Sequence, residues 1–473
     1  MVLEYVKSSK RKDLLVFVGY LFEKDYTKNG KTYWKCTKYN TDKCLGRAHT
    51  KDDAVVHHKD EHNHIPNAAE IGAKKLIQKV KETATSQIEA TPHQVISQIP
   101  SSSQAICAAL PSVPAMKKIV QRIRRRENAP PSNPLTLAEL ILIEPYTHTL
   151  NNDPFILYDS GVGNDNRILL FSTDKNLKIL ASEQCHWFID GTFKSSPHLF
   201  TQLLTIHTIK FNTVLPLVFA LLPNKTKASY DRVARELLNL NKNLQPATIM
   251  TDFEPALFGA FSDIFTNTKI RGCFFHFGQC IWRKIQTMSD IREKYISDAD
   301  FALNIKQLMA LAFIPVRDVE DTFDELMSQS FFVEHEELLR PLTDYFEDTW
   351  IGRPTRRRIR RPPTFSLDLW NQYDATLEGL PKTNNSVEGW HKAFSSLLAA
   401  THPTIWRLID TLKKEQGLTE IKINQLMVGQ EPPAKRKKYR EVATRIENIV
   451  ATYNDCDKKE YLIGIAHNLE MQK

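Results

Sequence analysis

The sequence is poor in cysteine, in glycine and in long apolar runs. Its 473 residues include 7 Cys and 16 Gly. Seven scattered cysteines are too few for a disulfide framework in a chain of this length, so we expect a reducing, intracellular compartment. The longest apolar stretch, residues 213–223, is interrupted by Pro216 and is far shorter than the roughly 20 residues of a membrane span. We therefore expect a soluble chain with no membrane partner.

Two motifs are incomplete near the N-terminus. Lys7 and Lys10 precede the apolar run 14–22 as in a signal peptide, but no small-residue cleavage site follows, so the run is predicted to be a first β-strand. Gly30-Lys31-Thr32 ends like a phosphate-binding loop, but Asp25 stands where that loop requires its first glycine. Neither secretion nor nucleotide binding by this loop is expected.

The composition is that of a globular protein, with 42% hydrophobic and 25% charged residues. A chain of this length is expected to contain two or three units. Its 63 Lys and Arg exceed its 55 Asp and Glu, which gives a formal charge of +8. Residues 1–64 hold 13 Lys and Arg against 9 Asp and Glu, an excess of +4 in a small part of the chain. This concentration favours a polyanionic partner.

The N-terminal third divides by composition into two segments. Residues 1–66 alternate short apolar and aromatic runs with polar turns such as Asn29-Gly30, which predicts a small antiparallel β module. Residues 67–134 form helical patches, predicted over 68–83, 92–99 and 114–127, and are expected to be a linker or a DNA-contacting segment. A module of 66 residues is too small to be stable by core burial alone, so it needs an additional stabilising cross-link.

The remainder of the chain, from residue 135, predicts an α/β domain with a helical insertion. Strand patterns occur at 168–171, 186–189, 199–211, 215–222, 248–250 and 272–275, and helix patterns at 230–240 and 255–264. Strands at hairpin spacing followed by strand-helix alternation favour a mixed sheet. The helical insertion is expected over about 291–374, within a domain spanning 135–430, and residues 431–473 are expected to form a basic helical tail.

Four potential zinc ligands lie in the β module. They are spaced as C-x7-C followed by H-x-H: Cys36, Cys44, His62 and His64. Two thiolates and two imidazoles make a closed tetrahedral set, and a structural Zn²⁺ would supply the folding free energy that the module lacks. His57 and His58 are alternatives, but adjacent strand residues face opposite ways, so at most one of them could join the site.

At these residues the chain resembles a FLYWCH-type zinc finger, over roughly residues 7–64. The matching residues are Phe22, Tyr33-Trp34-x-Cys36, Cys44 and His62-x-His64, while Tyr20-Leu21-Phe22 departs from the usual first aromatic block. The resemblance implies a zinc-stapled module that binds DNA or protein.

Three acidic residues stand in contexts that favour a metal site. Asp190 ends the apolar run 186–189, and Asp252, which is 62 residues later, ends a second strand pattern and precedes a helix. If the two strands are neighbours, the carboxylates converge at one edge of the sheet. Oxygen ligands of this kind suit Mg²⁺ or Mn²⁺. A third carboxylate, Glu388, begins another helix, for which Ser386 or Asn385 would be the cap.

From about residue 135 to 430 the chain resembles a Mutator-like element (MULE) transposase. The landmarks that carry the resemblance are Asp190-Gly191-Thr192-Phe193, Thr251-Asp252-x-Glu254-x-Ala256, Cys273-x-x-His276, Tyr345-Phe346-Glu347-x-x-Trp350-Ile351-Gly352 and Asn384-Asn385-x-x-Glu388-x-Trp390. The resemblance implies an RNase H-like catalytic domain with a helical insertion and a DDE-type acidic triad at Asp190, Asp252 and Glu388. It further implies metal-dependent DNA cleavage followed by strand transfer.

The Cys273-x-x-His276 pair admits two interpretations. With Cys280 as a weak third ligand it could bind zinc, or it could be a buried cysteine beside a hydrogen-bonded histidine. The resemblance implies a supporting role close to the catalytic edge, where the pair would position DNA or the second aspartate.

Several basic and aromatic residues are candidates for DNA contact. They are Arg124, Arg125, Arg126, Arg356, Arg357, Arg358 and Trp390. Guanidinium groups can follow a phosphate backbone, and an indole can stack on a base, although a solvated charge run or a core tryptophan would give the same pattern. The basic residues 435–438 resemble a nuclear localisation signal, so we expect the nucleus.

Taken together, the motifs predict a DNA transposase whose partners are double-stranded DNA and other copies of the chain. The alternative is a domesticated, transposase-derived regulator that binds DNA without transposing it. Both would carry structural Zn²⁺, and the enzyme would also require Mg²⁺ or Mn²⁺.

Overall fold

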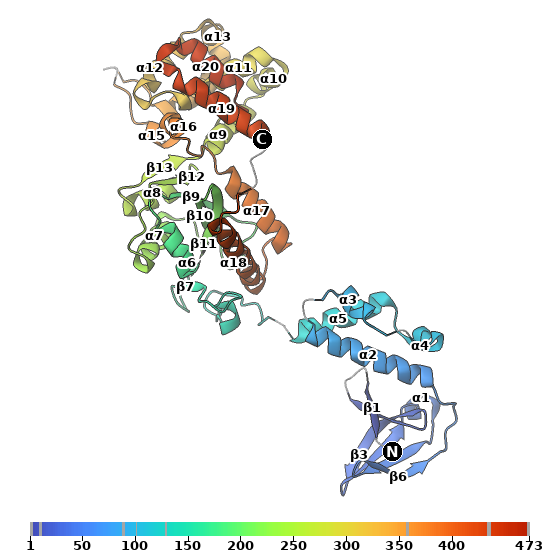
Figure 1. The fold of residues 1–473 in the computed structure, drawn as a ribbon. Helices are drawn as coiled ribbons and strands as arrows, with labels where there is room; N and C mark the ends of the chain where they lie inside the picture. The colour runs from blue at the N-terminus through green and yellow to red at the C-terminus, as the bar shows by residue number, and fades with distance from the viewer. Residues whose placement is uncertain are drawn as a thin grey trace. The chain divides into compact units, whose positions relative to one another are not determined.

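The computed structural model describes residues 3–8, 12–87, 90–100, 102–127, 130–355, 359–432 and 437–470. The chain divides into two compact units, Met1–Pro131 and Ser132–Lys473 (Figure 1). Within the described ranges, no helix is both long enough and apolar enough to cross a membrane.

The first unit begins with a six-stranded antiparallel sheet whose strands follow sequence order. The strands are β1 (Glu4–Lys7), β2 (Asp13–Phe17), β3 (Tyr20–Lys28), β4 (Lys31–Cys36), β5 (Arg47–Lys51) and β6 (Ala54–Lys59). The Asn29-Gly30 turn joins β3 to β4 with positive φ at both residues, as the sequence predicts. The prediction of a single strand over 14–22 is wrong, because Val18 and Gly19 also take positive φ and make a hairpin turn there.

Helices complete the first unit. They are α1 (Tyr39–Asp42), α2 (Ala68–Ser86), α3 (Pro92–Ser97), α4 (Gln104–Ala109) and α5 (Val113–Glu127). Asn67 caps α2 by accepting the backbone N–H of Glu70, and Thr91 begins α3 with a capping box. Ile71 of α2 packs against Val6 of β1, so the helical segment and the β module belong to one compact unit.

The second unit is built on a seven-stranded mixed sheet in the order β13-β12-β9-β10-β11-β8-β7. The strands are β7 (Ile156–Asp159), β8 (Leu169–Phe171), β9 (His186–Thr192), β10 (Gln202–Lys210), β11 (Thr213–Leu222), β12 (Thr248–Thr251) and β13 (Lys269–Gly272). The strands β9, β10 and β11 pair antiparallel, whereas β12 pairs parallel with both β9 and β13. The predicted strand at 272–275 is wrong, since β13 ends at Gly272 and a helix begins at Phe274.

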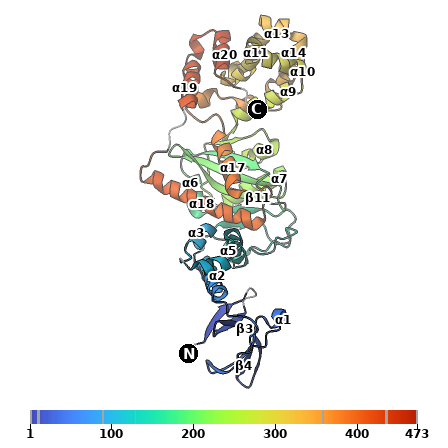
Figure 2. The same cartoon turned by 90° about the vertical axis from the view of Figure 1, so that its right-hand side faces the viewer.

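Helices cover both faces of this sheet (Figures 1 and 2). On one face lie α6 (Asp174–Leu180), α7 (Lys227–Leu240) and α8 (Pro255–Ile264), and on the other α17 (Asn385–Leu398) and α18 (Ile405–Met427). The first core contains Trp187 and Ile189 of β9, and the second contains Phe171 and Phe219. Strands that are apolar on both faces are the expected result of covering a sheet twice.

A helical subdomain lies between β13 and α17. It contains α9 (Phe274–Gln286), α10 (Ser289–Ser297), α11 (Ala299–Ala310), α12 (Val319–Met327), α13 (Ser330–Glu334), α14 (Glu336–Phe346), α15 (Leu367–Trp370) and α16 (Tyr373–Leu377). Short turns complete it: 3-10 helices at Leu311–Phe313 and Val316–Asp318, and a π-helix at Glu347–Ile351. The expected tail also packs here, because α19 (Lys437–Ala451) and α20 (Lys458–His467) share its core through Val450 and Ile465.

Candidate active site and zinc centre

The register of β12 against β9 brings two of the candidate carboxylates together. Met250 pairs with Phe188 in a parallel ladder, and all pairs of this ladder are 62 residues apart. Asp252 and Asp190 have the same separation, so they follow the ladder as the next pair on the same face of the sheet. Neighbouring strands lie about 4.8 Å apart, which places both carboxylates at one edge.

A small apolar cluster beneath this edge positions the third carboxylate. It joins Phe188, Met250 and Cys273 at the strand ends to Val387 of α17. Because Val387 is fully buried there, the first turn of α17 is held over the sheet edge, and Glu388 follows directly.

The carboxylates of the edge are partly buried and repel one another. Burial, followed by the negative charges of Asp190 and Glu254, raises the pKa of Asp252 to about 6. The Oδ1 atom of Asp252 is buried and has no hydrogen-bond partner within the described part of the chain. Burial and the charge of Asp190 also raise the pKa of Glu388. Hard oxygen donors in this condition fit a divalent cation, which would satisfy the lone pairs and offset the repulsion.

The three carboxylates are spread more widely than the ligands of one closed site. Within the ranges that the structure describes, groups of three or more potential ligand atoms lying within 4.8 Å of one another are found at Cys36, Cys44, His62 and His64, and at His58, Asp60 and His62. The acidic edge is therefore an open arrangement, in contrast to the zinc-type group.

Asn384 lies at the start of α17 and contacts both Cys273 and Asp190. The cap was expected to be Ser386 or Asn385, but the N-cap residue is Asn384, and its side chain makes no cap hydrogen bond. Its Oδ1 instead accepts from the Cys273 thiol at 3.1 Å, and its Nδ2 donates to Asp190 Oδ2 at 3.5 Å. The asparagine therefore links α17 to the ends of β9 and β13.

The Cys273-x-x-His276 pair supports the acidic edge from the start of α9. The Cys273 N–H donates to Thr251 O at 2.9 Å, next to Asp252, and burial raises the pKa of its thiol to about 12. His276 Nε2 lies 3.7 Å from Glu388 Oε1, and burial lowers its pKa. Cys280 is half-buried and packs against the helical core, without joining a group of metal ligands.

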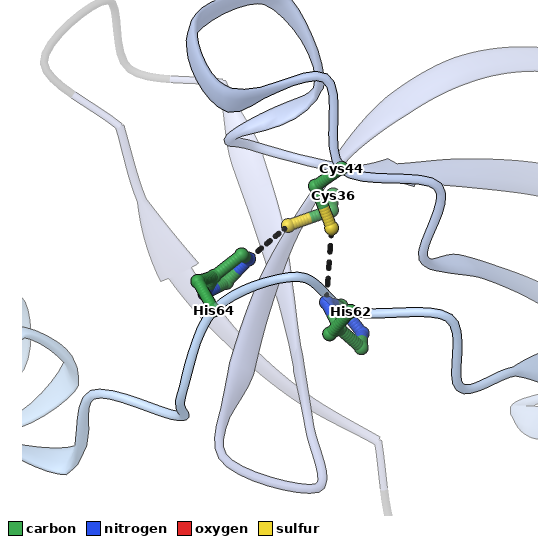
Figure 3. A group of neighbouring side chains, drawn as sticks. All are labelled: Cys36, Cys44, His62 and His64. Atoms are coloured by element: carbon green, nitrogen blue, oxygen red, sulfur yellow. Dashed lines mark hydrogen bonds between the residues drawn. The ribbon is translucent and has the colours of Figure 1, made fainter.

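The four predicted zinc ligands converge in the first unit (Figure 3). Cys36 Sγ lies 3.3 Å from His64 Nε2, and Cys44 Sγ lies 3.2 Å from His62 Nδ1. Both cysteines are buried. Burial raises the pKa of Cys36 to about 11, which a bound Zn²⁺ would reverse by stabilising the thiolate. The donor set fits a structural zinc ion.

Packing fixes the histidine side of this centre. The ring of Tyr20 stacks on His62 at a centroid distance of 3.6 Å, and a Cβ at Gly46 would lie 2.2 Å from the same imidazole. Only glycine leaves room for the ring at this position. The alternative ligand His58 lies with Asp60 and His62 in a second group of potential ligands.

The candidate DNA-contacting residues fall in three different situations. The guanidinium of Arg124 donates to Ala84 O and Gln87 O, where it binds the C-terminal carbonyls of α2. Trp390 donates to Glu415 Oε1 at 2.7 Å and stacks on Phe394 in the core. Arg356, Arg357 and Arg358, and the side chains of Arg125 and Arg126, lie outside the described residues.

A basic aromatic face on the β module was missed by the sequence reasoning. Residues directly opposite across antiparallel strands share a face. One row contains four contacting rings, at centroid distances of 4.3 to 4.8 Å: Tyr26, Tyr33, His49 and His57. The pairs on either side of it carry five cations: Lys28, Lys31, Lys35, Arg47 and Lys59. Two of them are in ion pairs, Lys35 with Glu23 and Asp25, and Lys59 with Glu61. The alternation of Lys31, Tyr33 and Lys35 at every second residue could have predicted this face from the sequence.

Removing a zinc ligand is expected to abolish zinc retention. In Cys36→Ser the hydroxyl is a poor ligand, so the zinc content should fall from about one ion per chain to near zero, measured by elemental analysis of the purified protein. The β module should then lose its sheet signal in circular dichroism, because the binding free energy of a structural zinc is folding free energy. Cys107→Ser, which removes an exposed thiol of the same unit, is the control. Full zinc content in both variants would contradict the assignment.

Neutralising Asp252 is expected to stabilise the metal-free protein. Because its pKa is raised to about 6 from the ordinary value of 3.8, the wild type should lose unfolding free energy as pH rises from about 4 through 6, by about 3 kcal/mol at neutral pH. Asp252→Asn should recover about 1 to 3 kcal/mol at pH 7.5 in chelator and lose that pH dependence, measured by denaturant unfolding. The exposed Asp290→Asn should change stability by less than about 0.5 kcal/mol. Equal pH profiles for all three proteins would contradict the assignment.

Comparison with known proteins identifies two regions of the chain. Residues 5–64 match the FLYWCH zinc finger domain, and residues 186–279 match the MULE transposase domain. No curated protein matches the chain. Among solved structures, the Drosophila P element transposase strand transfer complex is matched at 10% identity with a TM-score of 0.25, over 72% of this chain and 98% of that chain. A TM-score this low does not establish a shared fold. The two matched regions are the ones whose motifs resemble a FLYWCH zinc finger and a MULE transposase, as the sequence predicted.

Proposed function

We propose that the chain is a DNA transposase that cleaves and joins DNA strands at the acidic edge of its larger sheet. The observation that carries the proposal is the convergence of Asp190, Asp252 and Glu388 at one sheet edge, with an unpartnered oxygen of Asp252 inside it. The match to the MULE transposase domain covers the first two of these residues.

The strand arrangement supports an RNase H-like interpretation of the domain. Three antiparallel strands, β9 to β11, are followed by two parallel strands that extend the sheet beyond β9. Asp190 follows the centre of the first strand and Asp252 follows the first parallel strand. The helix that carries the third carboxylate comes after a long helical insertion and packs back on the same edge.

The chemistry follows from the charges that the edge can hold. Divalent ions bound there would lower the pKa of a water molecule and stabilise the leaving 3′ oxygen of a phosphodiester. Asp190 interacts with both of the other carboxylates, since its negative charge raises the pKa of Asp252 and of Glu388. Its Oδ1 accepts the Gly191 N–H, so the carboxylate is held in one orientation. Asn384 and Cys273 fix the helix that carries Glu388.

The basic aromatic face of the β module is the proposed DNA interface of the first unit. Five cations flank a row of rings in which Tyr26 and Tyr33 are stacked, while the contacts of His49 with Tyr33 and His57 are tilted. A flat face of this kind suits the backbone and groove edges of duplex DNA. Double-stranded DNA is accordingly the proposed partner.

Oligomerisation and nuclear localisation stay predictions. Assembly would bring two transposon ends together, which a single acidic edge does not do. Of the proposed localisation signal, Lys437 and Lys438 begin α19 and pair with Glu441 and Glu470, while residues 435 and 436 lie outside the described ranges.

The function is tested by DNA nicking with a supercoiled plasmid that carries the genomic DNA flanking the gene. With Mn²⁺ or Mg²⁺ the wild type should nick it. Asp190→Ala and Glu388→Gln should lower the rate by at least roughly 100-fold, because losing a metal ligand costs more than the roughly 10- to 100-fold loss caused by changing a residue that only hydrogen-bonds to a ligand. Asp290→Asn is the control. Nicking by Asp190→Ala at the wild-type rate would overturn the proposal. Undiminished DNA binding without nicking by the wild type would identify the regulator instead.

The proposed DNA interface is tested by the salt dependence of binding. Lys31→Glu should weaken duplex binding and reduce the slope of log K against log salt by about 1, the value for one phosphate contact. Fluorescence anisotropy at several salt concentrations measures both quantities. Lys79→Glu makes the same charge change on the exposed side of α2. If both variants lose affinity equally, net charge explains the binding and the face has no special role.

A further inference from the structure

A histidine that no motif singled out lies against the acidic edge. His391 Nε2 is 3.4 Å from Asp190 Oδ2, and the side chain is 13% exposed. Both ring nitrogens are buried, and neither has a hydrogen-bond partner among the residues that the structure describes. A buried imidazole normally makes a hydrogen bond with at least one of its nitrogens. In His391 the Nε2 atom that faces the carboxylate is therefore free to bind another group.

The position of His391 on α17 explains why its side chain lies close to Asp190. Glu388 and His391 are three residues apart on α17, so their side chains lie on the same face of the helix. The apolar cluster that fixes the first turn of α17 therefore positions both groups over the sheet edge. Behind the imidazole lie the rings of His207 and Trp390, at centroid distances of 6.3 and 5.1 Å. These two rings pack against the imidazole of His391.

The separation of the two atoms fits ligands of one ion better than a direct bond. A charge-assisted hydrogen bond between imidazole and carboxylate would be about 2.7 to 2.9 Å long. Two neighbouring ligands that are each about 2.1 Å from an octahedral ion lie about 3 Å apart, and somewhat more at wider angles. In the zinc-type group of the same chain, the cysteine and histidine ligand atoms are 3.2 and 3.3 Å apart.

We infer that His391 is a nitrogen ligand of the divalent ion held by Asp190, and that this centre selects a first-row transition ion such as Mn²⁺ over Mg²⁺. The inference rests on the proposed function, because it assumes that the acidic edge binds metal. Mg²⁺ demands oxygen ligands and dehydrates reluctantly, whereas imidazole is a good ligand for first-row transition ions. A site made of oxygen ligands alone would not select a transition ion over Mg²⁺ in this way.

His276, which lies beside a different carboxylate of the edge, provides the matched comparison. Its Nε2 lies 3.7 Å from Glu388 Oε1, and its Nδ1 is also buried without a partner. It differs from His391 in facing Glu388 and in belonging to α9, which begins at the end of β13. Replacing each histidine separately therefore distinguishes coordination by His391 from a general effect of losing an imidazole near the carboxylates.

The experiment measures coordination directly in the full-length, zinc-loaded protein, with Mn²⁺ alone as the probe. Pulsed electron paramagnetic resonance should detect ¹⁴N coupling to bound Mn²⁺ in the wild type. The coupling should be lost in His391→Gln and kept in His276→Gln. Titration calorimetry should show Mn²⁺ affinity falling by roughly tenfold or more in His391→Gln, while Mg²⁺ affinity changes much less. His391→Asp, which supplies an oxygen ligand, should restore metal binding without ¹⁴N coupling and shift the preference toward Mg²⁺.

The outcomes separate this inference from the proposed function. If Mn²⁺ binds, Asp190→Asn abolishes binding, and the ¹⁴N coupling is absent or persists in His391→Gln, the inference is overturned and the acidic metal site stands. If Mn²⁺ does not bind in the wild type, or binds equally well to Asp190→Asn, both fail. Circular dichroism of each variant verifies that it is folded, and His391→Asp tests the assignment where His391→Gln is unstable.

Discussion

The parallel pairing of β12 with β9 is the constraint on which the rest of the larger unit depends. Every pair of that ladder has the same sequence separation, so the two aspartates that follow it must become neighbours. A shift of one residue would turn one carboxylate to the opposite face of the sheet, into the core that holds Trp187 and Ile189. The apolar pair Phe188 and Met250 prevents such a shift, because both must face the cluster under α17. The register that fills this cluster is thus the register that assembles the acidic edge.

The two candidate metal centres differ in what destabilises their ligands in the absence of metal. At the zinc-type centre the donors are two buried cysteines and two histidines, and burial favours the neutral thiol of Cys36 until a metal arrives. At the acidic edge the donors repel one another, and burial favours the protonated form of Asp252. The first centre is closed, since its four ligand atoms lie within 4.8 Å of one another, whereas the second leaves space between its carboxylates. A closed set suits a structural ion, and an open one leaves coordination positions for water and phosphate.

The sequence predicted most of the strands, the turn at Asn29-Gly30, and the Cys and His set, because each depends on short-range pattern or ligand spacing. It failed where an apolar run serves two elements. Residues 272–275 predicted a strand, but the chain turns at Cys273, and Phe274 and Phe277 pack as one face of a helix. His391 was missed because its importance depends on the distance to Asp190, although its spacing from Glu388 was visible. That distance follows from the packing of α17 on the sheet, which no local pattern encodes.

The helical insertion explains how an acidic residue far along the chain can belong to the same site. The insertion leaves the sheet at Cys273 and returns at Asn384, and the two residues are joined by hydrogen bonds in both directions. Next to them the Phe274 N–H donates to Lys382 O at 2.9 Å. The two ends of the insertion are therefore held together. The conformational entropy lost on ordering the insertion is offset by burial of its own hydrophobic core, to which α19 and α20 contribute. Because the two ends of the insertion are joined at the end of β13 and Val387 is held in the apolar cluster, the position of Glu388 depends on local contacts and hardly at all on the length of the insertion.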